Sequence, residues 1–135
     1  MEDLIKAIYE TLSTDPVLTS LVPAEQIRRG WNEPVEYPTV RFTLSDLIPI
    51  GDDMDNKEIT RNALIINILA DGDLELEPIV DAVIDAVKAK SLIRDGFTIH
   101  ACDYISDDRG TYFDMLRKRH RKDLSFSIIY SQVQD

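Results

Sequence analysis

The stretch of residues 58–70 limits the fold more than any other part of the chain. Its centre, Ala-Leu-Ile-Ile-Asn-Ile-Leu at 63–69, is a nearly continuous run of β-prone side chains. A run of this kind between polar turns is typical of a strand that is covered on both faces. We therefore predict a central strand over 58–70, covered on both faces by the chain itself or on one face by a neighbouring subunit.

The flanking patterns predict two helices and several further strands. Apolar residues recur every three or four positions over 4–12, which predicts a helix that ends at Thr14-Asp15-Pro16. A second helix is expected to start between 74 and 78 and to end near 90, with Pro78 in its first turn. Alternating patterns or short apolar runs predict strands at 26–29, 39–44 (extended to 47–50 past Pro49), 97–105 and 122–133. This order favours an α+β fold: an antiparallel, or mixed, sheet of four to five strands with two helices packed on one face.

Length and composition indicate one globular domain. The chain has 135 residues, of which 44% are hydrophobic and 30% charged. We expect a single domain over 1–135, with a loop or arm projecting around 47–58 and another around 106–122. No segment is apolar for about 18 residues, so no membrane-spanning helix is expected, and the first twelve residues lack the regions of a signal peptide. Cys102 is the single cysteine, so an internal disulfide is excluded and a reducing cytoplasm is slightly favoured.

The residues that could carry enzyme chemistry do not form a recognisable site. His100 and Cys102 share one face of a predicted strand, as a nucleophile and its base would, but a half-buried strand explains them better. The acidic segment 51–58 lacks the glycine and the twelfth-position acid of a calcium loop. Carboxylates at 71–77 suit the positive end of the following helix dipole. We therefore expect no enzyme activity, no catalytic, cofactor-binding or metal-binding residues, and no cofactor.

The distribution of charge is the most unusual feature of the sequence. The net charge is -10, yet residues 96–135 hold six acids and six bases, so the negative excess lies in the first two thirds. The bases concentrate in one run, which comprises Arg117, Lys118, Arg119, His120, Arg121 and Lys122. This run could contact nucleic acid, meet an acidic surface of an identical neighbour, or be a solvated entry to the last strand.

Trp31 lies in an irregular segment that also holds Gly30, Asn32 and Pro34. An exposed aromatic residue in a loop often marks an interface. A tryptophan that covers the edge of the core explains the position equally well. Trp31 and the five Arg and Lys residues of 117–122 are therefore the candidate oligomer or partner interface.

The order of these landmarks resembles one family. A first helix runs into LSTDPVLTSLV, a short IRRG segment and a proline loop lead to YPTVRF, and an apolar strand precedes PIVDAVIDAVKAKSL. The chain closes with RHRKDLSFSIIY. This order, over residues 4–130, is similar to that of the small tail-completion or tail-to-head joining proteins of long-tailed bacteriophages and prophages, which are related to tail terminators. The acidic turn 51–58 and the basic run depart from the usual pattern of the family.

The resemblance implies a structural role in a virion. Such subunits form a ring, commonly hexameric, at the head-proximal end of the tail, and they are assembled in the cytoplasm of the bacterial host. The implied partners are further copies of the chain, the tail tube protein and the head connector proteins, without a membrane. In such a ring the run 117–122 could line the lumen through which DNA passes. The alternative is an accessory factor that contacts nucleic acid through the same run.

Overall fold

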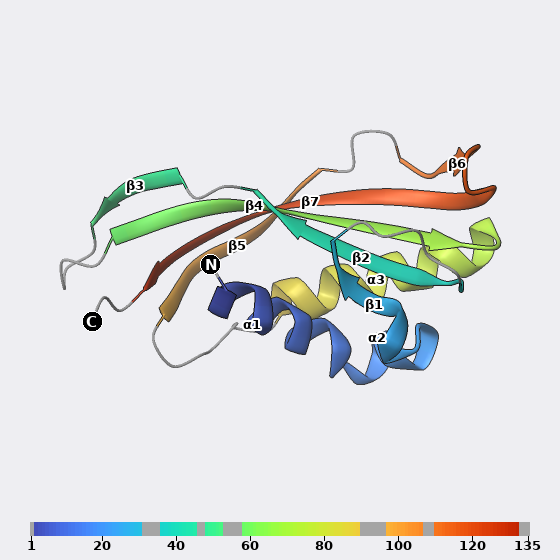
Figure 1. Ribbon diagram of the computed structural model, residues 1–135, viewed down its shortest axis with the longest axis horizontal. Helices are drawn as coiled ribbons and strands as arrows, with labels where there is room; N and C mark the ends of the chain where they lie inside the picture. The colour runs from blue at the N-terminus through green and yellow to red at the C-terminus, as the bar shows by residue number, and fades with distance from the viewer. Residues whose placement is uncertain are drawn as a thin grey trace.

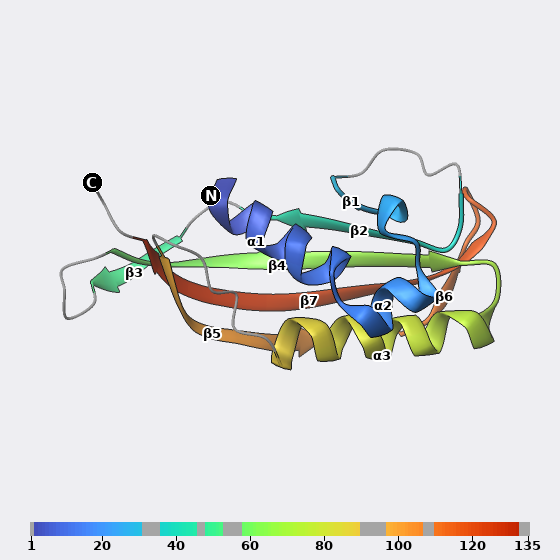
Figure 2. The same ribbon diagram turned by 90° about the horizontal axis from the view of Figure 1, so that it is seen from below.

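The computed structural model describes residues 2–30, 36–45, 48–52, 58–89, 97–106 and 110–132, and these form a β-sheet with helices on one face (Figure 1). The turned view shows α1, α2 and α3 lying together in front of the sheet (Figure 2). The end of the sheet that contains β3 extends beyond the helices. The opposite face of the sheet, here called the open face, carries no helix of the described residues.

The sheet has seven strands, and five of them form a continuous path in the order β1-β2-β4-β7-β5. β1 and β2 are parallel, and the other neighbouring pairs are antiparallel. Two strands lie off this path, because β3 pairs with β4 and β6 pairs with β7. The strands are β1 Ile27–Arg29, β2 Thr39–Leu44, β3 Ile48–Asp52, β4 Glu58–Ala70, β5 Phe97–Ser106, β6 Tyr112–Asp114 and β7 Arg119–Gln132.

The first helix ends at the predicted break, whereas the helix predicted to start between 74 and 78 begins earlier, at Asp73. α1 spans Glu2–Ser13 and α2 spans Pro16–Leu21, and Asp15 separates them. The Asp15 carboxylate accepts hydrogen bonds from the backbone N–H groups of Val17 (3.1 Å) and Leu18 (2.9 Å), which caps α2. A short 3₁₀ turn, η1 Ala24–Gln26, leads into β1, and α3 spans Asp73–Ala89. Pro78 lies inside α3, five residues after its first residue, and not in its first turn.

The core lies between the helices and the strand residues that alternate toward them. Phe42 faces Ile66 across β2 and β4, and Leu64 faces Phe126 across β4 and β7, all with no exposed surface. They pack in one cluster with Leu4, Ile8 and Leu12 of α1 and with Ile79, Val83 and Val87 of α3. Edge-to-face packing of Tyr104 on Phe126, with ring centroids 5.5 Å apart, extends the core under β5.

The strand predicted over 58–70 is present as β4, and it lies at the centre of the sheet. The helices cover one of its faces, while Ile65 on the open face remains 39% exposed. Farther along the same face, Leu69 and Arg41 are buried. The apolar run therefore has one fully covered face and one face that is only partly covered by the described residues.

The predicted α+β class is confirmed, with the helices on one face and a mixed sheet. Four to five strands were predicted and the sheet has seven. The two short strands account for the difference, because β6 lies in a predicted loop or arm and β3 lies in the predicted extension of β2. β3 continues β2 in the same direction along β4, since Leu44 pairs with Leu64 and Ile48 pairs with Arg61, so the predicted extension past Pro49 is present as a separate strand. The last strand begins at Arg119 and not at 122, so four of the six residues of the basic run lie within it.

Candidate functional site

The basic run folds into a hairpin formed by β6 and β7. Tyr112 pairs with Arg121, Phe113 with His120 and Asp114 with Arg119. The four residues 115–118 make the turn, and Lys118 closes it with a φ of 58°, in the left-handed region. The Lys118 backbone N–H donates to the Asp114 carbonyl over 2.7 Å. The interface residues predicted at 117–122 are therefore brought together, whereas Trp31 lies outside the described residues.

Asp114 is the anchor of this hairpin. Its carboxylate, 7% exposed, accepts hydrogen bonds from the Arg117 backbone N–H (3.0 Å), from Arg117 Nη1 (3.1 Å) and from Arg121 Nη1 (2.9 Å). Burial by itself raises the pKa of Asp114, but the hydrogen bonds from Arg117 and Arg121 outweigh it and hold the pKa below its usual value. Asp114 is therefore charged at neutral pH and joins the turn to β7.

Asp123 connects the hairpin to the centre of the sheet. It accepts from Arg121 Nε (2.8 Å), from Asn67 Nδ2 of β4 (2.6 Å) and from the Tyr112 hydroxyl of β6 (2.8 Å). Burial raises the pKa of Asp123, and the same three hydrogen bonds more than compensate, so its pKa is lowered. Arg121 bridges Asp114 and Asp123, and its guanidinium carbon lies 5.8 Å from the centre of the Tyr112 ring.

The third arginine of the run is also paired. Arg119 Nε lies 2.7 Å from a carboxylate oxygen of Asp71, just after β4, and the guanidinium lies 4.3 Å from the centre of the Tyr37 ring. Arg117, Arg119 and Arg121 are thus held by carboxylates of the same chain. In sequence the run looks like a positive patch, but in the fold its arginines pair with the carboxylates of Asp71, Asp114 and Asp123. They are correspondingly less available to phosphate groups. Lys122 lies opposite Ile68 of β4, and Lys118 is exposed at the turn.

The same turn presents apolar side chains to solvent. Met115 is 78% exposed and Leu116 is 79% exposed. Beside them Phe113 packs its ring edge-to-face against His120, with centroids 5.4 Å apart, and remains half exposed. Sequence reasoning missed this feature. The available signal was an apolar pair, Met-Leu, between the charged residues Asp114 and Arg117.

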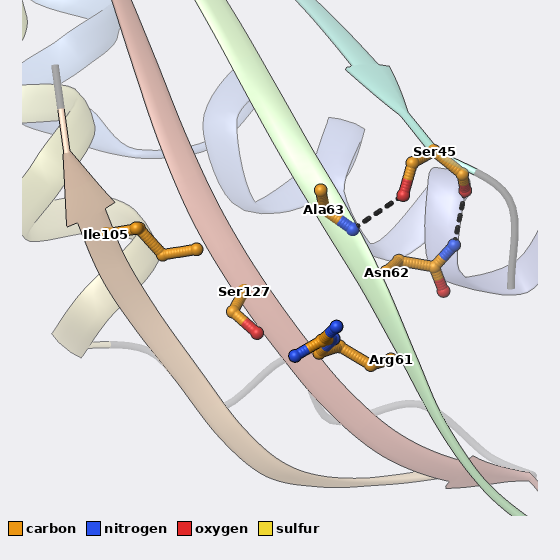
Figure 3. A pocket seen from close by; sticks show the side chains of 6 residues that line it. All are labelled: Ser45, Arg61, Asn62, Ala63, Ile105 and Ser127. Atoms are coloured by element: carbon orange, nitrogen blue, oxygen red, sulfur yellow. Dashed lines mark hydrogen bonds between the residues drawn. The ribbon is translucent and has the colours of Figure 1, made fainter. Parts of the chain in front are cut away.

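The open face of the sheet has a shallow hollow near its middle. Its volume is about 220 Å³, and the described residues that line it are Ser45, Arg61, Asn62, Ala63, Ile105 and Ser127. Ile105 of β5 and Arg61 of β4 both point toward Ser127 of β7 (Figure 3). Ser45 fixes the rim, because its hydroxyl accepts from the Ala63 backbone N–H (2.8 Å) and its carbonyl accepts from Asn62 Nδ2 (2.5 Å). Ile105 is 59% exposed, so an apolar side chain borders the hollow.

The residues considered for catalysis or metal binding do not assemble in the described part of the chain. Burial, followed by the charge of Asp103, raises the pKa of the Cys102 thiol to about 11, so the nucleophilic thiolate is scarce at neutral pH. The side chain of His100 and residues 53–57 of the acidic segment lie outside the described residues. Among the described residues, no three potential metal ligands cluster, and no helix has the length and apolarity needed to cross a membrane.

Comparison with solved structures shows a likeness of fold, whereas the sequence comparisons found no match. No protein-family model matches the chain, and no curated protein matches its sequence. Among solved structures, a chain of the "Virion of native gene transfer agent (GTA) particle" is similar, with a TM-score of 0.77 and 20% sequence identity. The alignment covers 95% of this chain and 94% of that chain. The two chains therefore share a fold over nearly their whole length.

Proposed function

We propose that the chain is a structural subunit of a phage-like particle, acting in tail completion or head-tail joining as part of an oligomeric ring at the head-proximal end of the tail. The observation that supports this most strongly is the likeness to a chain of a gene transfer agent virion, because it extends over 95% of this chain. The order of sequence landmarks, which resembles that of tail-completion proteins, supports the finer assignment to the tail end.

The chemistry of the described residues agrees with a role in assembly. A raised Cys102 pKa disfavours nucleophilic catalysis. The ion pairs of Arg117, Arg119 and Arg121 stabilise a hairpin instead of displaying positive charge. An exposed apolar turn and a hollow on the open face are features that contacts with other subunits would cover.

The test is binding to tails. The purified protein should bind at one end of tail tubes taken from the particle encoded by the same genome, and image averaging should show a ring there. A protein that leaves both ends of the tubes bare would refute the proposal. Duplex DNA provides the contrast: a nucleic-acid factor would bind it at low salt and lose affinity steeply as salt rises. We expect no such binding by the isolated protein.

A further inference from the structure

Two features of the described surface are not covered by other described residues. The first is the turn between β6 and β7, here called the apolar tip, formed by Met115 and Leu116. The second is the hollow around Ser127 on the open face. Two adjacent large apolar side chains, each more than three quarters exposed, are costly to leave in water if no other surface covers them.

The tip and the hollow of one molecule cannot meet. Asp114 pairs with Arg119 at the start of β7, whereas Ser127 lies eight residues farther along the same strand. At a rise of about 3.3 Å per residue, this separates them by about 26 Å. Any contact between the two features must therefore join two copies of the chain.

The sizes of the two features agree. The hollow has a volume of about 220 Å³, and an apolar cavity of about 150 Å³ is large enough for benzene. It can therefore accept the end of a leucine or methionine side chain. Ala63 and Ile105 offer apolar contact, and the aliphatic stem of Arg61 can cover an inserted side chain while its charge stays in water.

The charges beside the two features are complementary. Lys118 is exposed next to the apolar tip. Asp103 of β5 is exposed and pairs in register with Ser127, so it lies beside the hollow on the same face. Arg61 provides the opposite charge on the β4 side of the hollow. A tip that enters with Lys118 toward Asp103 has one favourable orientation, because the reverse would bring Lys118 to Arg61.

We propose that the apolar tip of one copy inserts into the hollow of the next copy, with Leu116 or Met115 against Ala63 and Ile105 and with Lys118 beside Asp103. This inference rests on the proposed ring and identifies the surfaces that build it. The contact joins unlike surfaces of identical chains, so it repeats from copy to copy and forms a ring when the rotation between copies closes.

The test uses pairs of single-cysteine variants in a Cys102→Ala background. Leu116→Cys and Ser127→Cys proteins are mixed at the highest soluble concentration and treated with a short bis-maleimide. The mixture should give a cross-linked dimer that neither variant gives alone, and the double variant should give a ladder of higher oligomers. A Val17→Cys variant, at a 61% exposed position on α2, replaces Leu116→Cys as the matched control and should give no such product with Ser127→Cys.

Three single substitutions and one double variant test the details of the contact. Leu116→Asp should weaken self-association at least about tenfold, because it removes an apolar side chain that the proposed contact buries. Lys118→Asp and Asp103→Lys should each weaken it, and the protein that carries both changes should recover. If the double variant is as weak as the single ones, the two charges do not meet and the proposed orientation is wrong.

The outcomes separate this inference from the proposed function. Absence of the mixed cross-link overturns the inference. If rings still form on tail ends, the proposed function stands and other surfaces build the ring. If tail ends remain bare while the mixed cross-link appears, the contact is real and the assignment to the tail end is wrong.

Discussion

Replacing Asp114 by alanine tests whether the ion pairs of the basic run hold the β6–β7 hairpin in place. The variant leaves the Arg117 backbone N–H, Arg117 Nη1 and Arg121 Nη1 without the oxygens that now lie 2.9–3.1 Å away. Hydrogen bonds to charged groups contribute about 1.5–3 kcal/mol each when they are removed singly. Arg121 keeps Asp123 and Arg117 can turn toward water, so we expect a total loss of about 2–3 kcal/mol in the free energy of unfolding.

Urea denaturation measures this loss, and hydrogen exchange locates it. Amides of Tyr112–Asp114 and of the first residues of β7 should exchange faster in the variant, whereas those of β4 should change little. Asp103→Ala is the matched control, because it removes an exposed carboxylate from another strand and should shift stability by less than about 0.5 kcal/mol. If Asp114→Ala behaves like this control in both measurements, the account of the basic run as a structural element is wrong.

Three other predictions concern the same fold. Folding lowers the pKa values of Asp114 and Asp123, so the folded state binds fewer protons than the unfolded state. The contribution of the two carboxylates to the free energy of unfolding is therefore complete above about pH 4 and is lost as the pH falls further. Measurements of unfolding at decreasing pH should show this loss. Cys102, with a pKa of about 11, should react slowly with iodoacetamide at neutral pH and faster as the pH rises toward that value; a fast reaction at pH 7 would show a different environment. Phe126→Ala should reduce the free energy of unfolding by about 3–5 kcal/mol, measured in urea, and a loss below about 1 kcal/mol would contradict its place in the core.

Local signals in the sequence predicted much of the fold. The apolar run of 58–70 predicted the central strand, and the Asp15-Pro16 pair predicted the break that separates α1 from α2. These signals are local, since they depend on side chains a few residues apart. The extension of 39–44 past Pro49 was also predicted and is present as β3, but no local signal showed that it is a separate strand with an irregular register on β4.

The candidate site could be predicted only in part. The sequence singled out residues 117–122, and these residues do form one structural unit. It did not show that Arg119 pairs with Asp71, or that Asp123 pairs with Asn67 across 56 residues. Such contacts depend on the register between β4, β6 and β7, which no local pattern encodes. The arginines of a run that looked like a surface charge patch are for this reason paired with carboxylates of the same chain.

The exposed features depend on the fold in the same way. Met115 and Leu116 form an apolar pair in the stretch 106–122, for which the sequence predicted a projecting loop or arm, and their exposure follows from the tight turn that Lys118 closes. The hollow brings together residues of β4, β5 and β7 and the end of β2. Neither feature follows from composition, and together they give the proposed ring its surfaces.

Electron microscopy of tail tubes incubated with the purified protein shows whether the protein completes tails. We expect added density at one end of each tube, which resolves on averaging into a ring of identical subunits with the fold described above. Tubes whose two ends stay identical and bare, at protein concentrations where self-association is detected, would contradict the proposed function.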